Sequence, residues 1–348
     1  MSRHLLDAVG DAMGLASLDP GGRRLAIRSL LRDVVTEPAL AASVGRLSDW
    51  IDGFGPLTPL MKDPSVTDVL VNAVDEVWVE RDGSLEMTGV RFEDTVELMD
   101  LIEKLVGGAG ARVDAMHPVA DARLSDGSRL HVVLPPVADR GPLLSIRRFP
   151  EVALRLGDLV EHAFLTAAET SRLRAAVEAR RTIVISGSTG AGKTTLANAL
   201  LDCVPESERV VLIQEIPELR PACRHWVSLL TRAANVEGAG GIDQLMLLRA
   251  ALRMRPDRIV VGEVRGAEAA AALQAMSTGH EGSLLTLHAR SAADAPDRFV
   301  ELARMAPAAP AEATLARQTA RAFDIVVHVG REQGRRKVLE IVERDGSA

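Results

Sequence analysis

The stretch that most constrains the fold of this chain reads Gly187-Ser188-Thr189-Gly190-Ala191-Gly192-Lys193-Thr194. It matches the pattern G-x-x-x-x-G-K-[ST] at every fixed position. The apolar, β-branched run 182–186 precedes it, as expected of a buried parallel strand. The run 195–201 follows with helix-forming composition and no helix breaker. Strand, glycine-rich loop and helix in this order predict a phosphate-binding α/β domain. The alternative is a glycine-rich turn that binds nothing.

The chemistry of this loop predicts ATP and Mg²⁺ as ligands. Glycines let backbone N–H groups close around a phosphate chain, and the following helix turns its positive end towards it. Lys193 can place its charge on the β- and γ-phosphates, and the hydroxyl of Thr194 can bind Mg²⁺. Thr195, the next residue, is included among the predicted nucleotide-binding positions.

Composition narrows the class of protein. A chain of 348 residues is long enough for two domains, and 47% apolar residues can fill their cores. A net charge of −7 and an aromatic content of 3% argue against binding of nucleic acid. No window approaches the roughly 18 uninterrupted apolar residues of a membrane span, and no signal peptide is evident. With only Cys203 and Cys223 as thiols, we expect a cytoplasmic protein that reaches membranes through partners.

The chain divides into four predicted segments. Residues 1–55 are expected to be helical and partly disordered, with an amphipathic helix at 24–35. Residues 56–150 are expected to form a small α+β domain, residues 151–181 a linker and a helix, and residues 182–348 a nucleotide-binding domain. The α+β domain is predicted to hold a helix at 95–106 and strands at 66–72, 77–80, 119–124, 129–134 and 143–146.

Two more strands of the nucleotide-binding domain end in carboxylates. The run 210–213 leads into the acidic run 214–218, and the run 258–263 ends in Glu263. The carboxyl ends of parallel strands face the ligand crevice of an open sheet. Glu263 is therefore predicted to face Mg²⁺ and its bound water. The alternative for each acidic group is a solvated strand end.

Cationic side chains accompany these acids. Arg253 and Arg265 flank the third strand, and a guanidinium matches phosphate oxygens in a bidentate geometry. The sequence leaves open whether they reach a phosphate or pair with nearby acids. His280 and His288 bracket the expected fourth strand, where they either read the phosphate state or the subunit edge, or are structural. The last two strands are predicted as a hairpin about Gln333-Gly334, in which His328 is only a strand residue.

Several motifs recur in one order and carry a family resemblance. They are the phosphate loop, Glu215-Ile216-Pro217-Glu218-Leu219, the run from Leu252 to Gly266, and Thr278-Gly279-His280-Glu281-Gly282 with Thr286-Leu287-His288-Ala289. In this order the chain resembles the ATPases of type II and type IV secretion systems. Within these it is most similar to the tight-adherence (Flp) pilus assembly ATPases. That closer similarity rests on Gly53-Phe54-Gly55-Pro56-Leu57, Val71-Asn72, Trp78-Val79-Glu80-Arg81 and Asp121-Ala122-Arg123-Leu124.

The resemblance implies a homohexameric ring of RecA-like P-loop domains with a twisted, mostly parallel sheet, each preceded by a mobile PAS-like α+β domain. ATP would lie between the two domains. Partners would be inner-membrane platform proteins of a pilus or secretion system, reached from the cytoplasmic face of the membrane. The implied roles are phosphate and Mg²⁺ binding by Lys193 and Thr194, activation of water by Glu218, contact with the metal-bound water by Glu263, a histidine box of His280 and His288, and γ-phosphate contacts by Arg112, Arg123, Arg129 and Arg147.

One departure from the family pattern leaves alternatives open. The acidic motif of relatives begins Glu-Asp, whereas this chain has Gln214-Glu215. An amide cannot act as a base, so slow hydrolysis is one expectation. The leading hypothesis is a motor that uses ATP hydrolysis to drive assembly or retraction of pilin. The alternatives are a nucleic-acid-translocating hexamer and a nucleotide-gated assembly module with weak hydrolysis.

Overall fold

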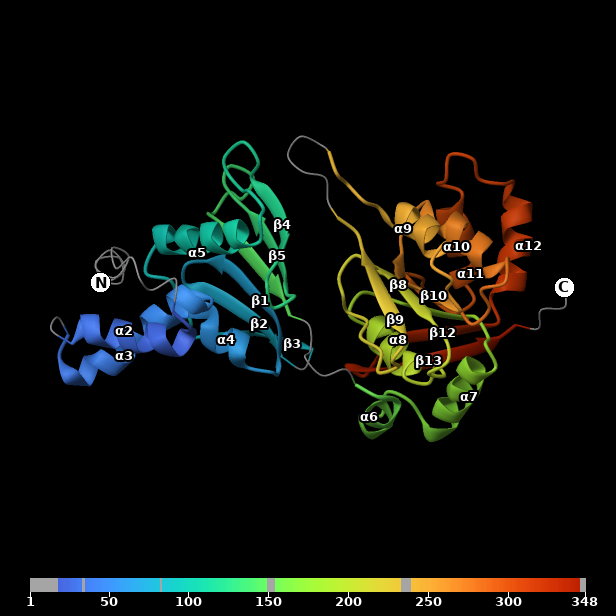
Figure 1. The fold of residues 1–348 in the computed structure, drawn as a ribbon, viewed down its shortest axis with the longest axis horizontal. Coiled ribbons are helices and arrows are strands. Elements are labelled where there is room, and N and C mark those ends of the chain that lie inside the picture. The colour runs from blue at the N-terminus through green and yellow to red at the C-terminus, as the bar shows by residue number, and fades with distance from the viewer. Residues whose placement is uncertain (1–17, 33–34, 82, 149–153, 233–238, 345–348) are drawn as a thin grey trace. The chain divides into compact units, whose positions relative to one another are not determined.

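The computed structural model describes residues 18–32, 35–81, 83–148, 154–232 and 239–344. It divides into two compact units, unit 1 from Met1 to Pro150 and unit 2 from Glu151 to Ala348 (Figure 1). Each unit is described by itself. The finer boundaries predicted at residues 55 and 181 remain predictions, and most of the predicted disordered segment, residues 1–17, lies outside the described residues.

Unit 1 begins with two packed helices, α2 (Pro20–Leu31) and α3 (Glu37–Asp52). Asp19 caps α2 by accepting a hydrogen bond from the Gly22 amide, so this helix starts four residues before the predicted one. The helices share a small core of Ile27, Leu31, Leu40, Val44 and Leu47. The sequence did not predict α3.

The rest of unit 1 is an antiparallel sheet covered on one face by a helix. Within the described residues the strand order is β3-β2-β1-β6-β5-β4. Helix α5 (Thr95–Gly108) buries Leu98, Leu101, Ile102 and Leu105 against the sheet. The remaining elements are η2 (Gly55–Leu57), α4 (Thr58–Lys62), β1 (Val66–Ala73), β2 (Glu76–Arg81), β3 (Ser84–Met87), β4 (Val119–Arg123), β5 (Arg129–Val133) and β6 (Leu143–Arg147).

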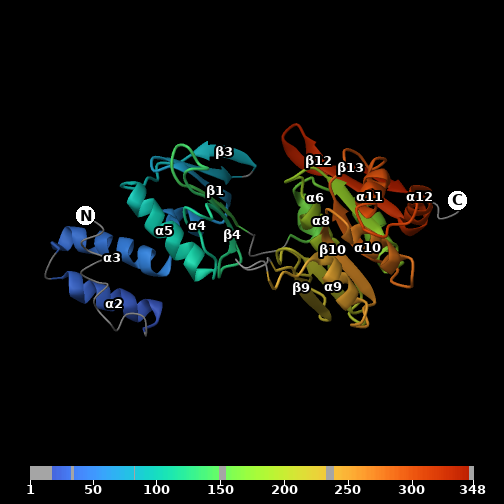
Figure 2. The same cartoon turned by 90° about the horizontal axis from the view of Figure 1, so that it is seen from above.

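Unit 2 is a three-layer α/β sandwich around a sheet of order β13-β12-β7-β11-β10-β8-β9. Its strands are β7 (Ile183–Gly187), β8 (Val210–Gln214), β9 (Trp226–Leu230), β10 (Arg258–Val264), β11 (Leu284–Leu287), β12 (Ile325–Glu332) and β13 (Arg335–Glu343). All neighbours pair in parallel except β12 and β13, which form the predicted terminal hairpin (Figure 2). The predicted α/β class is confirmed.

Helices cover both faces of this sheet (Figure 1). One face packs against α6 (Leu156–Glu161), α7 (Ala167–Glu178) and α8 (Lys193–Leu201). The other packs against α9 (Gln244–Ala251), α10 (Glu268–Met276), α11 (Ala295–Ala303) and α12 (Glu312–Ala322). Burial on both faces explains why the central strands are continuous apolar runs: every residue of β7 and β11 is buried.

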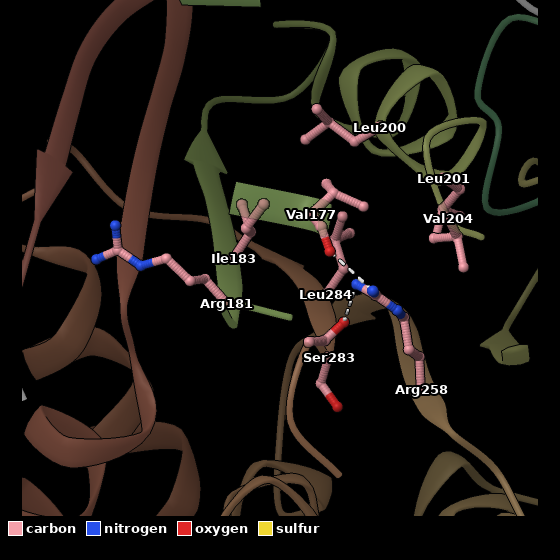
Figure 3. Close-up of a pocket in the computed structure, with 10 residues that line it drawn as sticks. Val177, Arg181, Ile183, Leu200, Leu201, Val204, Arg258, Ser283 and Leu284 are labelled. Atoms are coloured by element: carbon pink, nitrogen blue, oxygen red, sulfur yellow. Dashed lines mark hydrogen bonds between the residues drawn. The ribbon is translucent and has the colours of Figure 1, made fainter. Parts of the chain in front are cut away.

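A buried ion pair joins the strands at the edge of the sheet where they begin. Arg258 at the start of β10 is 2% exposed, and its Nε lies 2.5 Å from Oε2 of Glu208. Its other nitrogens donate to the carbonyls of Val177 (2.8 Å) and Gly282 (3.3 Å). Figure 3 shows this guanidinium reaching between the end of α7 and the loop before β11. One side chain therefore connects three elements that are far apart in the sequence.

Arg258→Met is expected to lower the free energy of unfolding of unit 2 by about 2–4 kcal/mol, because it leaves the largely buried Glu208 carboxylate with only its longer contact to Arg180, at 3.4 Å, and removes the donor to two backbone carbonyls. Urea unfolding and calorimetry would measure the loss. The control is Arg304→Met, whose ion pair with Glu312 is exposed and is expected to contribute about 0–1 kcal/mol. Equal effects of the two substitutions would contradict this prediction.

Candidate nucleotide-binding site

The phosphate loop lies where the sequence placed it, between β7 and α8. Gly187 has φ +154°, and a Cβ there would stand 2.2 Å from the carbonyl oxygen of Val329 on β12. Gly192 has φ +99° and caps α8, with the ring of Phe164 against it. No other residue fits these two positions without moving the neighbouring strand or ring. The loop therefore presents backbone and the start of a helix rather than side chains.

Lys193 is folded back over this loop. Its side chain is buried, and Nζ donates to the carbonyls of Gly187 (3.1 Å) and Ser188 (3.0 Å). Thr194 and Thr195 follow on the first turn of α8 and are half-buried. A buried ammonium beside a helix start suits a polyphosphate, since both the lysine and the helix end favour negative charge.

The carboxylates of both acidic motifs gather around Arg265, just beyond β10. Its Nη2 lies 2.5 Å from Oε2 of Glu263, and its Nη1 lies 3.1 Å from Oε2 of Glu215. Burial lowers the pKa of Arg265, but Glu263, Glu215 and Glu218 outweigh it and raise that pKa above its ordinary value. Arg265 therefore pairs with the acids in this structure, which answers the question that the sequence left open.

Glu263 also contacts His288, which follows β11. Nε2 of His288 lies 2.5 Å from Oε1 of Glu263, so the ring and the carboxylate are in direct contact. A carboxylate at the end of β10, on the edge of the sheet that carries the phosphate loop, could accept a hydrogen bond from a metal-bound water. Glu263 and Thr194 are thus the residues here that could hold Mg²⁺.

Gln214 has a structural position at the end of β8. Its side chain is buried; Oε1 accepts from the Leu219 amide (2.8 Å) and Nε2 donates to the hydroxyl of Ser228 on β9 (2.9 Å). Both ends of the amide are therefore satisfied. Gln214 fixes the loop that carries Glu218 to the edge of the sheet. The sequence treated this residue only as a missing carboxylate.

The predicted arginines of unit 1 form a row across three strands. Arg123 pairs directly with Arg129, and Arg129 pairs directly with Arg147. All three are exposed, on the face of the sheet opposite α5. Arg129 forms an ion pair with Asp121 (3.2 Å) and Arg147 lies 3.8 Å from Asp68, so nearby acids offset part of the like-charge repulsion within this row. Arg112 lies outside the row and pairs with Asp114 at 2.5 Å.

Two predicted residues are not brought to the phosphate loop of unit 2. His280 precedes β11 and Arg253 precedes β10, so both lie at the edge where the strands begin. The ring of His280 is instead 3.2 Å from the carbonyl of Ala275. Because the phosphate loop is at the other end of these strands, nucleotide contact by either residue within this unit is not supported. The roles predicted for His280 and Arg253 stay predictions.

His328 was predicted as only a strand residue, but it adjoins the phosphate loop. Its Nδ1 lies 3.0 Å from the hydroxyl of Ser186, the residue before the loop. Nothing in the local pattern signalled this, since the contact depends on the register of β12 against β7, in which His328 is paired with Ser186.

A phosphate loop on the central strand of a parallel sheet, with an acid on a nearby strand, defines a P-loop nucleotide-binding domain. The sequence model of the type II/IV secretion system protein family matches residues 51–329, and the chain belongs to that family. The predicted membership is confirmed. The narrower tight-adherence assignment remains a prediction.

Relatives are similar over most of their length. A Mycobacterium tuberculosis protein named as a candidate conjugal transfer protein is 40% identical over 307 residues, covering 86% of this chain and 87% of its own. The conjugal transfer protein TrbB of Rhizobium radiobacter is 31% identical, over 82% of this chain and 86% of its own. The type IV secretion system protein PtlH homolog of Bordetella bronchiseptica is 33% identical, over 83% and 94%.

Solved structures share the fold. The pilus retraction motor PilT with bound ADP superposes with a TM-score of 0.58 at 19% identity, covering 80% of each chain. The Legionella pneumophila ATPase DotB gives 0.54 at 21% identity, covering 81% of this chain and 78% of its own. The RecA-like fold predicted for unit 2 is therefore confirmed. Among the described residues, no helix is both long and apolar enough to cross a membrane.

The site predicts a lowered pKa for His288. Burial lowers this pKa most, Lys193 and Arg265 add to the effect, and Glu263 opposes it. Since the unfolded ring titrates near 6.5, the unfolded chain binds the proton more readily. The stability that the neutral ring contributes is present above that pH and is lost as the pH falls through the folded-state pKa.

NMR titration of the His288 ring, assigned with His288→Gln, is expected to give a pKa below 6.5. Lys193→Ala should raise it, because a nearby positive charge is removed. Glu263→Gln should lower it further. If neither substitution changes the pKa of His288, the ring does not lie near these charges.

Proposed function

We propose that this chain is an ATPase motor of a type II/IV secretion system or type IV-like pilus, of the tight-adherence class. The observation that carries the proposal is the convergence of Lys193, Glu218, Glu263 and His288 at the phosphate-loop edge of one parallel sheet. Membership in the secretion family supports nucleotide binding and oligomeric action beside membrane machinery. The tight-adherence assignment rests on motif similarity in unit 1.

The residues would divide the chemistry among them. Backbone amides of the phosphate loop and Lys193 hold the phosphate chain. Glu218 orients the attacking water, and Glu263 accepts a hydrogen bond from a metal-bound water. Mg²⁺, when bound, would neutralise charge on the phosphates. Arg265 would balance the negative charge of these carboxylates until nucleotide binds.

The arginine row Arg123, Arg129 and Arg147 is the proposed source of further positive charge for the γ-phosphate. Support comes from its exposure and from the position of three arginines on adjacent strands, two of which also pair with acids. Hydrolysis in a hexamer would then produce motion of the two units that drives inner-membrane platform proteins to insert or extract pilin. Of the two alternatives, a nucleic-acid translocase has no specific support in the described residues.

Mg²⁺-dependent phosphate release tests the proposal. Lys193→Ala is expected to abolish nucleotide binding, whereas Glu218→Gln should keep binding and lower kcat by about 10²-fold or more, because the water is no longer oriented. Lys62→Ala changes an exposed lysine of unit 1 and serves as control. If the wild-type chain releases no phosphate, or Lys193→Ala matches it, the motor hypothesis fails.

Gln214→Glu distinguishes the motor from a nucleotide-gated module with weak hydrolysis. We expect kcat to stay within about two-fold, because a carboxylate can still accept from the Leu219 amide and from the Ser228 hydroxyl. Gln214→Leu removes both hydrogen bonds and should lower kcat and stability together. A large gain in turnover for Gln214→Glu would favour the module instead.

A further inference from the structure

The terminal hairpin extends past the phosphate loop. Strand β12 pairs in parallel with β7 up to Val329, which lies opposite Gly187. The next residues of β12, from Gly330 to Glu332, and the start of β13 continue beyond this last pair. This overhang therefore lies past the end of β7, where the phosphate loop begins.

Arg331 is the residue of this overhang that faces the loop. It is two positions beyond Val329, whose carbonyl and side chain lie against Gly187, so both side chains are on the same face of the strand. Its Nη2 lies 4.0 Å from the position that a Cβ on Gly190 would occupy. Apart from Gly190 and its two chain neighbours, no other atom of the described residues lies within 4 Å of that position. The guanidinium is thus placed at the turn of the phosphate loop.

A second arginine reinforces this charge. Arg336 on β13 is paired directly with Arg331. Glu332, the acid of the hairpin tip, is on the opposite face and forms an ion pair with Lys337. Since directly paired residues project to the same face of a hairpin, both guanidinium groups lie on the face that is directed to the phosphate loop.

We infer that Arg331, supported by Arg336, contacts the diphosphate that ATP and ADP share. This inference rests on the proposed nucleotide binding. The chemistry fits, because a guanidinium donates two parallel hydrogen bonds to phosphate oxygens. The phosphate loop supplies backbone amides and the ammonium group of Lys193. The hairpin adds the planar guanidinium of Arg331 from β12, the strand that pairs with β7. The Arg331 guanidinium would contribute to nucleotide binding rather than to the chemical step. Its removal is therefore expected to raise KM and Kd more than it lowers kcat.

The test measures binding of a fluorescent ADP analogue, and its displacement by ATP and by inorganic pyrophosphate, in the full chain with Mg²⁺. Arg331→Ala is expected to weaken all three about ten-fold, and Arg331→Lys to weaken them less, because lysine keeps the charge without the fork. The matched control is Arg335→Ala, an exposed arginine at the same hairpin tip on the opposite face. It should stay within two-fold of the wild type, on the scale of an exposed charge.

The outcomes separate this inference from the proposed function. If the wild-type chain binds no nucleotide, or Lys193→Ala binds as well as the wild type, the proposed function itself fails. If the wild type binds, Lys193→Ala does not, and Arg331→Ala binds like the wild type, only the role of Arg331 is overturned. Weakened ADP binding with unchanged pyrophosphate binding would place Arg331 at the base or ribose and overturn the phosphate contact.

Discussion

Parallel pairing of β7 with its two neighbours is the interaction on which the site depends. Hydrogen bonds from β11 on one side and β12 on the other fix the register of the strand that ends in Gly187. Since parallel strands end at the same edge, that register also decides which side chains meet the phosphate loop. The pairing with β11 sets the position of His288, and the pairing with β12 sets the position of His328. A slip of one residue would turn both away.

The charges at this edge form a closed set. Arg265 is shared by the carboxylates of Glu263, Glu215 and Glu218, while Lys193 turns back on the loop's own carbonyls. Such an arrangement satisfies most charges within the unit, and His288 contacts the same Glu263 carboxylate. A polyphosphate that competes for Lys193 would change the field felt by His288, because Lys193 contributes to its lowered pKa. The nucleotide and the acidic cluster are therefore linked through shared charges.

Much of the fold and part of the site could be predicted from the sequence. The phosphate loop, the acidic strand ends and the terminal hairpin are local patterns, and local patterns survive folding when tertiary contacts agree with them. Strand β9 was not predicted although four of its five residues are apolar, because the run is short and lies at the sheet edge, where each residue is only half-buried. Helix α3 was missed although Leu40, Val44, Leu47 and Ile51 recur at helical spacing. Gln214 and Arg331 could not be understood locally, because their partners are set by the pairing of strands distant in sequence.

Strand β11 shows why the two histidines of one motif can have different surroundings. The strand has four residues, all buried, and His280 and His288 stand at its opposite ends. At the first end, the Arg258 guanidinium donates to the carbonyl of Gly282, where φ is +76° and a Cβ would collide with it. At the second end, His288 contacts Glu263. Because charged contacts fix both ends of so short a strand, it cannot shift along β10 or β7 without breaking one of them. The contact of Arg258 with Gly282, at the edge of the sheet without the phosphate loop, therefore helps to fix the register that places His288 beside Glu263.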